Sequence, residues 1–120
     1  MQIKIHIMDL QFTQKEKEAM FSVLCVLVKA DYRSRTDELG QLSEYAKELG
    51  IDGSYQPIPK AQLEGLAYET LKRMTIEKKR AFSGMMTQIA RSDGHFGPSE
   101  RAFVIEILEM CEIPFVHRGI

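Results

Sequence analysis

Residues 17–51 of this chain align on residues 79–113 without a gap, and this internal repeat is the feature that most restricts the fold. Charged and apolar positions recur at one constant offset. Two copies are too few for a solenoid, which needs at least about three repeats. They predict two related halves, each a buried helix, a short acidic loop and an outer helix. Matched pairs include Lys17 and Lys79, Ala19 and Ala81, Leu27 and Ile89, Leu42 and Val104, Glu44 and Glu106, and Ile51 and Ile113.

Helical periodicity runs from Thr13 onward and predicts a bundle of about five helices. Residues 13–16, TQKE, have the pattern of a capping box at the start of the first helix. In such a box, the side chains of Thr13 and Glu16 each accept a hydrogen bond from the other residue's backbone amide. The stretch MFSVLCVLV that follows is apolar on nearly every side, which predicts a helix at the centre of the bundle. The simplest arrangement packs the buried helices of the two halves against each other about a pseudo-twofold axis.

The remaining helices are predicted from apolar stripes and from residues that begin or end a helix. Gly50 ends the second helix as a left-handed cap, and Thr75 breaks the chain between the third and fourth helices. Pro98 suits the first turn of the fifth helix and Pro114 ends it. The stripes are Leu39, Leu42, Ala46 and Leu49 in the second helix and Leu63, Leu66, Ala67, Thr70, Leu71 and Met74 in the third.

The predicted fold is therefore all-α, with one compact helical domain at residues 13–114. Residues 1–12 form an extended N-terminal segment and residues 115–120 a C-terminal tail. Ile3, Ile5 and Ile7 alternate with polar residues, which is the pattern of a strand. Because a lone strand leaves its backbone groups unpaired, three arrangements are open: pairing with the tail, a homodimer through residues 2–8, or an extended path over the bundle.

The stretch SDGHFGPSE at 92–100 matches the second half of an EF-hand calcium loop. Calcium takes six to eight oxygen ligands, and loop positions 1 and 3 should supply two of them. Those positions hold Ile89, which has no side-chain oxygen, and Arg91, which is positively charged. The matching loop of the first half contains Arg33 and Arg35. An EF-hand is therefore excluded.

What remains is a pair of helix–loop–helix units with Asp and Glu at the same spacing. The segment MMTQIARSDGHFGPSERAFVIEILEMCEIP at 85–114, with its degenerate partner VLVKADYRSRTDELGQLSEYAKELGI at 26–51, resembles the TerB-like family of tellurite-resistance proteins. The likeness covers about residues 13–114. It implies an all-helical fold, a cytoplasmic location and a link to tellurite or chemical-stress resistance. It also implies metal binding or docking of a protein partner, without an established catalytic activity.

Carried onto this chain, the acidic positions of the family motif are Asp93 and Glu100, with Asp31 and Glu38 as their counterparts. These carboxylates, together with the ring or carbonyl of His95, are the candidate ligands of a weakly bound divalent metal ion. Hard cations prefer oxygen ligands of this kind. Two carboxylates in one loop predict low affinity.

A structural role is sufficient to explain the same residues, and it is the interpretation we favour. Asp93 can bond loop amides, as Asp does in turns. If Gly97 is the N-cap of the last helix, Glu100 stands third in that helix and can accept the cap amide. Tyr32 stands where the motif has Gly, so the first loop departs from the family pattern.

Composition and charge exclude several classes of function. The formal net charge is −1, so no global positive field attracts nucleic acid. The one basic run, at 72–80, has no aromatic residue to stack on bases and is interpreted as a solvated helix junction. The longest nearly apolar run, at 20–28, is too short to span a bilayer, which takes about 20 residues. No signal peptide is visible, and we expect a cytoplasmic protein.

No motif of a catalytic site is found. Cys25 and Cys111 sit among apolar neighbours without CxxC spacing, which indicates buried free thiols. The sequence has no GxSxG motif and no phosphate-binding glycine loop. We therefore expect a non-enzymatic binding or scaffold module with a protein partner. The alternative is a divalent-metal-binding protein with its ion at the acidic loops.

Overall fold

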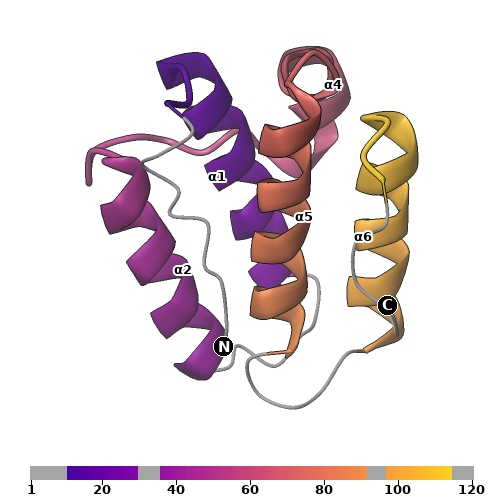
Figure 1. Cartoon of the computed structure of the whole chain (residues 1–120). Coiled ribbons are helices and arrows are strands. Elements are labelled where there is room, and N and C mark those ends of the chain that lie inside the picture. The colour runs from indigo at the N-terminus through magenta and orange to yellow at the C-terminus, as the bar shows by residue number, and fades with distance from the viewer. Residues whose placement is uncertain (1–10, 30–35, 92–96, 115–120) are drawn as a thin grey trace, which may run out of the picture.

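The computed structural model describes residues 11–29, 36–91 and 97–114, and the side chains of residues 36–38 are not included. These parts of the chain are helical and contain no strand, so the all-α prediction is confirmed (Figure 1). The helices are α1 (Gln14–Lys29), α2 (Thr36–Leu49), the 3-10 turn η2 (Lys60–Gln62), α3 (Leu63–Leu66), α4 (Tyr68–Lys72), α5 (Ile76–Arg91) and α6 (Pro98–Met110). The predicted strand at residues 2–8 and the tail at 115–120 lie outside the described residues.

Helix α1 is the centre of the bundle, as its apolar sequence predicts. It contacts α2, α3, α4, α5 and α6. Met20, Val23, Leu24 and Leu27 are fully buried in it. A helix surrounded on several sides must be apolar on several sides, because each contact removes part of its surface from water.

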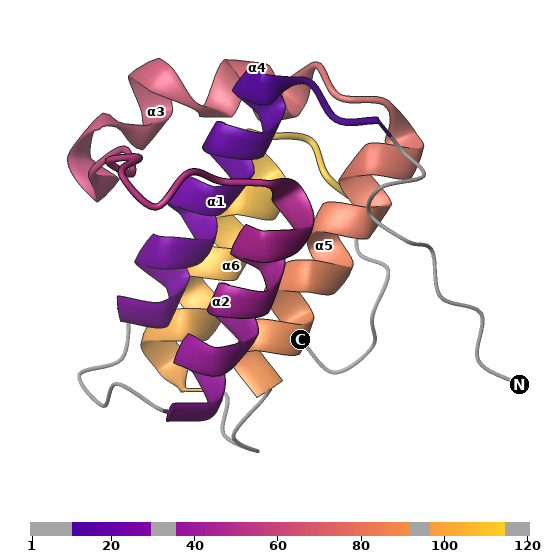
Figure 2. The ribbon, with the colours of Figure 1, turned by 90° about the vertical axis from the view of Figure 1, so that its left-hand side faces the viewer.

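The two halves of the repeat are two helix pairs that face each other. Helices α1 and α5 pack together in the middle, and α2 and α6 lie on opposite sides of that pair (Figures 1 and 2). Helix α2 also contacts α5, and α6 also contacts α1. This exchange of contacts is what a pseudo-twofold axis between α1 and α5 produces, so the packing agrees with the repeat.

The N-terminal caps of α1 and α5 follow the repeat residue by residue. Thr13 and Glu16 form the predicted capping box, with Thr13 N–H donating to Glu16 Oε1 at 2.8 Å and Glu16 N–H donating to Thr13 Oγ1 at 3.1 Å. Thr75 takes the place of Thr13 before α5, and its Oγ1 accepts the Lys78 N–H at 3.3 Å. Thr75 thus separates α4 from α5 because its side chain caps the new helix.

The C-termini of α2 and α6 also match. Gly50 and Glu112 have left-handed backbones, with φ of 69° and 54°. Ile51 N–H donates to Ala46 O at 2.9 Å, and Ile113 N–H donates to Leu108 O at 2.8 Å. These are the long bonds of Schellman motifs, which satisfy carbonyls at the end of a helix. Gly50 as the left-handed cap is confirmed, and Glu112 performs the same turn without glycine.

The connecting segment differs from the single helix predicted for it. The chain forms η2, α3 and α4, and Ala67, with φ −128° and ψ −38°, separates α3 from α4. Gly65 lies in the middle of α3, and glycine is a poor helix former because it has the most backbone freedom to lose. The prediction that Leu66 belongs to the buried stripe is wrong, because it is 56% exposed.

For one further residue, Leu39, the prediction that it belongs to a buried stripe is wrong. Leu39, in the first turns of α2, is 48% exposed, whereas Tyr45 and Leu49 on the same helix are buried. The core is built mainly from long aliphatic and methionine side chains. Besides Glu100, the largest fully buried residues are Phe82, Met20, Leu24, Leu27, Leu49, Leu63, Leu71, Met86, Ile89 and Ile107.

Candidate functional site

Glu100 is the one predicted acidic site residue whose side chain the structure describes. Asp31, Asp93 and His95 lie outside the described residues, as does the side chain of Glu38. Glu100 stands near the N-terminus of α6, at the lower end of the bundle in Figure 1. The N-terminus of α2 and the C-termini of α1 and α5 lie at the same end.

The carboxylate of Glu100 is almost completely buried, with 1% of its surface exposed. Gly97 is the N-cap and Pro98 the first helical residue, as predicted. Gly97 N–H donates to Glu100 Oε1 at 3.1 Å. The capping role of Glu100 is therefore confirmed, although Gly97 has no side chain to return the bond.

The second oxygen of Glu100, Oε2, is buried and has no hydrogen-bond partner among the residues that the structure describes. A buried polar atom without a partner costs on the order of 1–3 kcal/mol, and a charged one costs more. Such an atom needs an explanation, and a bound cation is one. The described residues contain no group of three His, Cys, Asp or Glu side chains placed to hold a metal. On its own, Glu100 does not supply the donors that a hard cation requires.

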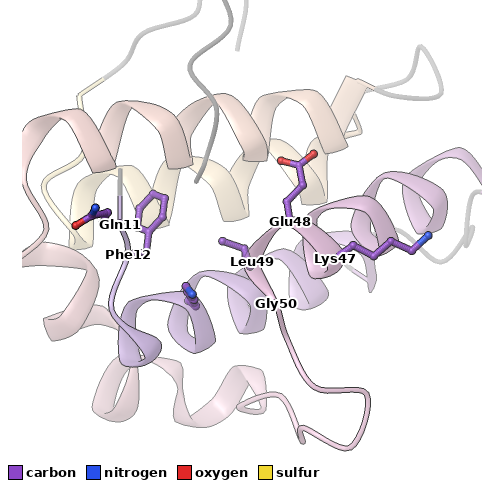
Figure 3. Close-up of a pocket in the computed structure, with 7 residues that line it drawn as sticks. Gln11, Phe12, Lys47, Glu48, Leu49 and Gly50 are labelled. Carbon is purple, nitrogen blue, oxygen red and sulfur yellow. The ribbon is translucent and has the colours of Figure 1, made fainter. Parts of the chain in front are cut away.

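A pocket lies at the opposite end of the bundle, between the start of α1 and the end of α2. Its volume is about 330 Å³, which is at the lower end of the range for ligand pockets. Leu49 extends from the end of α2 toward the side where Phe12 lies, and Lys47 points away along α2 (Figure 3). The lining residues are Gln11, Phe12, Lys17, Lys47, Glu48, Leu49 and Gly50. The lining therefore combines an apolar floor with a charged rim.

One residue of this lining, Phe12, also contacts an ion pair. Lys78 Nζ lies 2.8 Å from Glu16 Oε1 and 5.6 Å from the centre of the Phe12 ring. The ring is 7% exposed. The ammonium thus bonds a carboxylate on one side and faces an aromatic ring on the other, which is a favourable cation–π geometry.

The counterpart of Lys17 in the second half makes a different contact. Lys79, the counterpart of Lys17, is buried with 8% exposed, and its Nζ donates to Glu112 O at 3.0 Å. Lys17 is only half-buried, and no hydrogen bond among the described residues joins it to Gly50, the counterpart of Glu112. The two matched lysines therefore differ in burial and in their contacts.

Four basic residues of the run at 72–80 form ion pairs or hydrogen bonds with other described residues. These contacts join the ends of α4, α5 and α6 and the start of α1. This differs from the predicted solvated junction, since two lysines of the run are partly or fully buried. The contacts are Lys72 with Glu112 at 3.5 Å, Arg73 with Glu69 at 3.3 Å, Lys78 with Glu16 at 2.8 Å and Lys79 with Glu112 O at 3.0 Å.

Both cysteines are free thiols, as predicted. Burial raises the pKa of Cys25 to about 11, even though Lys29 opposes the shift. Burial likewise raises the pKa of Cys111 to about 12. Because the thiolate is the nucleophile, a thiol with so high a pKa is unreactive at neutral pH.

Two tyrosine hydroxyls are bonded inside the structure. Tyr45 donates to Gln88, and burial followed by the charge of Glu48 raises the Tyr45 pKa to about 12. Tyr68 donates to Glu106 Oε2 at 2.8 Å, and burial and this bond raise its pKa further. These hydroxyls stay protonated at neutral pH and tie α2 to α5 and α4 to α6.

Comparison with known proteins decides the family. A family model described as "Tellurite resistance protein TerB" matches residues 3–118. The chain belongs to this TerB family. The match covers nearly the whole chain, and it confirms the resemblance found in the doubled acidic motif. No curated protein and no solved structure matches this chain.

Within the residues that the structure describes, none of the helices of this TerB-family chain is both long and apolar enough to cross a bilayer. Sequence reasoning found the acidic end of the bundle but missed the pocket at the other end. A signal was present in the repeat itself. Lys17 and Lys79 align, yet Phe12 aligns with Met74 and Gly50 with Glu112. The residues around the two lysines therefore differ, and different packing at these ends of the two halves could have been expected.

Proposed function

We propose that the chain is a non-enzymatic binding module that acts in resistance to tellurite or related chemical stress. The observation that carries this proposal is the TerB family match over residues 3–118. Burial raises the pKa of both thiols, so neither is activated as a nucleophile. The cytoplasm is the proposed location, in line with the family resemblance.

The pocket between α1 and α2 is the proposed contact surface for a protein partner. Phe12 and Leu49 lie almost fully buried at its base, and the more exposed side chains of Lys17, Lys47 and Glu48 offer polar contacts and apolar stems around it. Interfaces commonly combine a buried apolar centre with a polar rim. The partner is therefore proposed to insert an apolar side chain here.

A tellurite survival assay tests this function. Cells that lack the gene are complemented with wild type, with the charge-reversed rim variant Lys47→Glu/Glu48→Lys, or with Glu109→Lys. Glu109 is the matched control, because it is exposed and is the counterpart of Lys47 in the second half. We expect wild type and Glu109→Lys to restore survival and the rim variant to fail. Equal survival with and without the wild-type gene would contradict the role in resistance.

A divalent cation at the acidic end of the bundle is the second candidate function. The observation that favours it is the buried Oε2 of Glu100, which has no partner within residues 11–29, 36–91 and 97–114. Asp93 and His95 are the proposed further ligands, with Asp31 and Glu38 as their counterparts in the first half. Where bound, the ion would neutralise the buried carboxylate and link the loop to α6.

A further inference from the structure

The contact between α1 and α5 is apolar on both sides, so hydrophobicity alone does not determine which halves pair. Four large apolar residues that α1 buries have counterparts in α5 that are also apolar and buried. By this criterion, one half could pack on the like half of a second copy as well as on the unlike half of its own chain. The polar contacts between the halves do distinguish them. The matched apolar pairs are Met20 and Phe82, Val23 and Met85, Leu24 and Met86, and Leu27 and Ile89.

The ion pair between Glu16 and Lys78 distinguishes unlike from like halves. The two residues are counterparts in the repeat, and within the chain their opposite charges meet, with 2.8 Å between Glu16 Oε1 and Lys78 Nζ. Two like halves packed in the same way would bring Glu16 against a second Glu16, or Lys78 against a second Lys78. Since these side chains are 14% and 16% exposed, little solvent screens the repulsion. Like charges brought together at an interface suppress the wrong pairing.

A hydrogen bond between α2 and α5 makes the same distinction. The hydroxyl of Tyr45, a residue that is 5% exposed, donates to Gln88. The counterpart of Tyr45 is Ile107 and that of Gln88 is Val26, and both of these lie in or against the apolar core. Like halves would therefore place Tyr45 opposite Val26 and Gln88 opposite Ile107, and the buried hydroxyl would lose its acceptor. A buried polar group without its partner is costly, so this pairing is disfavoured.

We propose that the surface between the two halves is a selective interface, which accepts the unlike half and rejects the like half. Its ordinary occupant is the other half of the same chain. The copy-to-copy association that it admits is an exchange, in which each chain gives its α5–α6 half to the α1–α2 half of a second copy. The exchange keeps the contacts between unlike halves, whereas a dimer of like halves would lose both polar contacts.

The junction between α4 and α5 is where the halves separate for such an exchange. It consists of residues 73–75, and the helices on its two sides end and begin independently. The Arg73 N–H bonds carbonyls of α4, whereas Thr75 caps α5. Exchange of an identical element between copies is a low-cost route to a dimer. Within the monomer, however, the tethered half is present at a high effective concentration. The wild-type chain is therefore expected to stay monomeric, and a substitution that makes the intrachain pair repulsive should reveal the exchange.

Two charge-reversal variants of the full chain, Glu16→Lys and Lys78→Glu, test the proposal when they are refolded together. Each variant alone carries like charges at positions 16 and 78, both within the chain and in any dimer of itself. In the mixture, one chain is positive and the other negative at both positions, so halves exchanged between the two chains attract each other. The variants are mixed in urea, diluted at high protein concentration and analysed by native mass spectrometry, with one of them isotopically labelled. We expect heterodimers in several-fold excess over the homodimers of either variant.

The matched control is a mixture of Lys15→Glu with Glu77→Lys. Lys15 and Glu77 are also counterparts of opposite charge, and both are exposed. The control mixture therefore has the same difference in net charge between its chains, while the Glu16–Lys78 pair is unaltered. Heterodimers that are no more abundant in the test mixture than in this control would overturn the proposal.

Zero-length carbodiimide cross-linking of the heterodimers shows which halves have paired, because it joins a carboxylate to an amine in contact with it. Peptide mass mapping should find position 16 of one chain joined to position 78 of the other. Cross-links that join 16 to 16 and 78 to 78 would overturn the proposal, because they would place like halves together. Neither experiment involves tellurite or a partner, so a failure here is distinct from a failure of the proposed function.

Discussion

Glu16 and Lys78 form an ion pair, with 2.8 Å between Oε1 and Nζ, and they occupy the same position in the two halves of the chain. They are 62 residues apart, which is the offset of the repeat. Under a twofold rotation, a residue can meet its own counterpart only near the axis. This pair therefore marks where the pseudo-twofold axis passes between α1 and α5. Its side chains are 14% and 16% exposed, so solvent screens them little.

The environment of Glu16 makes stability depend on pH. Burial raises the pKa of Glu16, but the Lys78 ammonium and the Thr13 amide and hydroxyl outweigh burial, so the pKa lies below its ordinary value of 4.5. A group with a lowered folded-state pKa contributes stability above its unfolded pKa and loses it as the pH falls through the folded pKa. We expect the stability advantage of wild type over Glu16→Gln to be full at neutral pH and to vanish in acid below that lowered pKa.

Urea unfolding of both proteins across that pH range measures this difference. Glu16→Gln keeps an acceptor for the Thr13 amide, so the comparison isolates the charge. Lys78→Met serves as the matched control, because without the ammonium the pH dependence attributed to Glu16 should shrink. A wild-type advantage that persists unchanged in acid would contradict the account.

The two C-terminal caps predict unequal responses when glycine is removed from one and introduced at the other. Gly50→Ala places a Cβ on a left-handed backbone and should lower the free energy of unfolding by about 1 kcal/mol. Glu112→Gly relieves the same strain at the equivalent position but adds freedom to the unfolded chain. We therefore expect a change of less than about 0.5 kcal/mol. The Lys72 pair lost with Glu112 is exposed and contributes little.

Denaturant midpoints of the two variants and wild type measure these effects. If Gly50→Ala were neutral, or if Glu112→Gly cost as much as Gly50→Ala, the equivalence of the two helix ends would be contradicted.

Much of the fold could be predicted because local signals agree with packing. Three features could be predicted from residues close together in sequence. They are the Thr13–Glu16 capping box, the central position of the apolar helix α1 and the left-handed cap at Gly50. The alignment of residues 17–51 on 79–113 then relates the halves. The break at Ala67 could not be predicted, because an apolar stripe with one glycine suits either one helix or two.

The candidate site was predictable only in part. The helix-capping bond of Glu100 follows from its spacing after Gly97 and Pro98. The complete burial of Glu100, and the lack of a partner for its Oε2 among the described residues, could not be predicted. They depend on how α6 packs against residues distant in sequence. The pocket was missed for the same reason, since its lining joins the start of α1 to the end of α2, about 30 residues later in the chain.

Ser22 is predicted to hold the loop after α2 against α1. It is fully buried, its Oγ accepts the Ile58 N–H at 2.9 Å, and it lies 3.4 Å from the Tyr55 hydroxyl. Ser22→Ala leaves the Ile58 amide without this partner and should cost about 1–2 kcal/mol. Ser43→Ala, at an exposed position of α2, is the control and should change stability by less than about 0.5 kcal/mol. Equal effects in urea unfolding would contradict the assignment.

Metal binding at Glu100 is tested by thermal unfolding in calcium, magnesium or manganese up to millimolar concentrations. A bound ion raises the melting temperature by mass action. If the second candidate function holds, wild type should respond and Asp93→Asn/Glu100→Gln should not. If Glu100 is only a cap, neither protein responds, and the double variant costs little because Gln and Asn keep the acceptors.

The Glu16–Lys78 charge swap tests the two-half architecture most directly. Glu16→Lys and Lys78→Glu each place like charges together and should each cost about 1–2 kcal/mol. Combined, they restore the pair, and the new Glu at position 78 stands three residues after Thr75, where it can rebuild on α5 the capping box lost from α1. Urea unfolding of wild type, both single variants and the double variant should show that the double variant recovers most of the summed loss. A double variant whose loss equals the sum of the two single losses would contradict a pseudo-twofold axis at this pair.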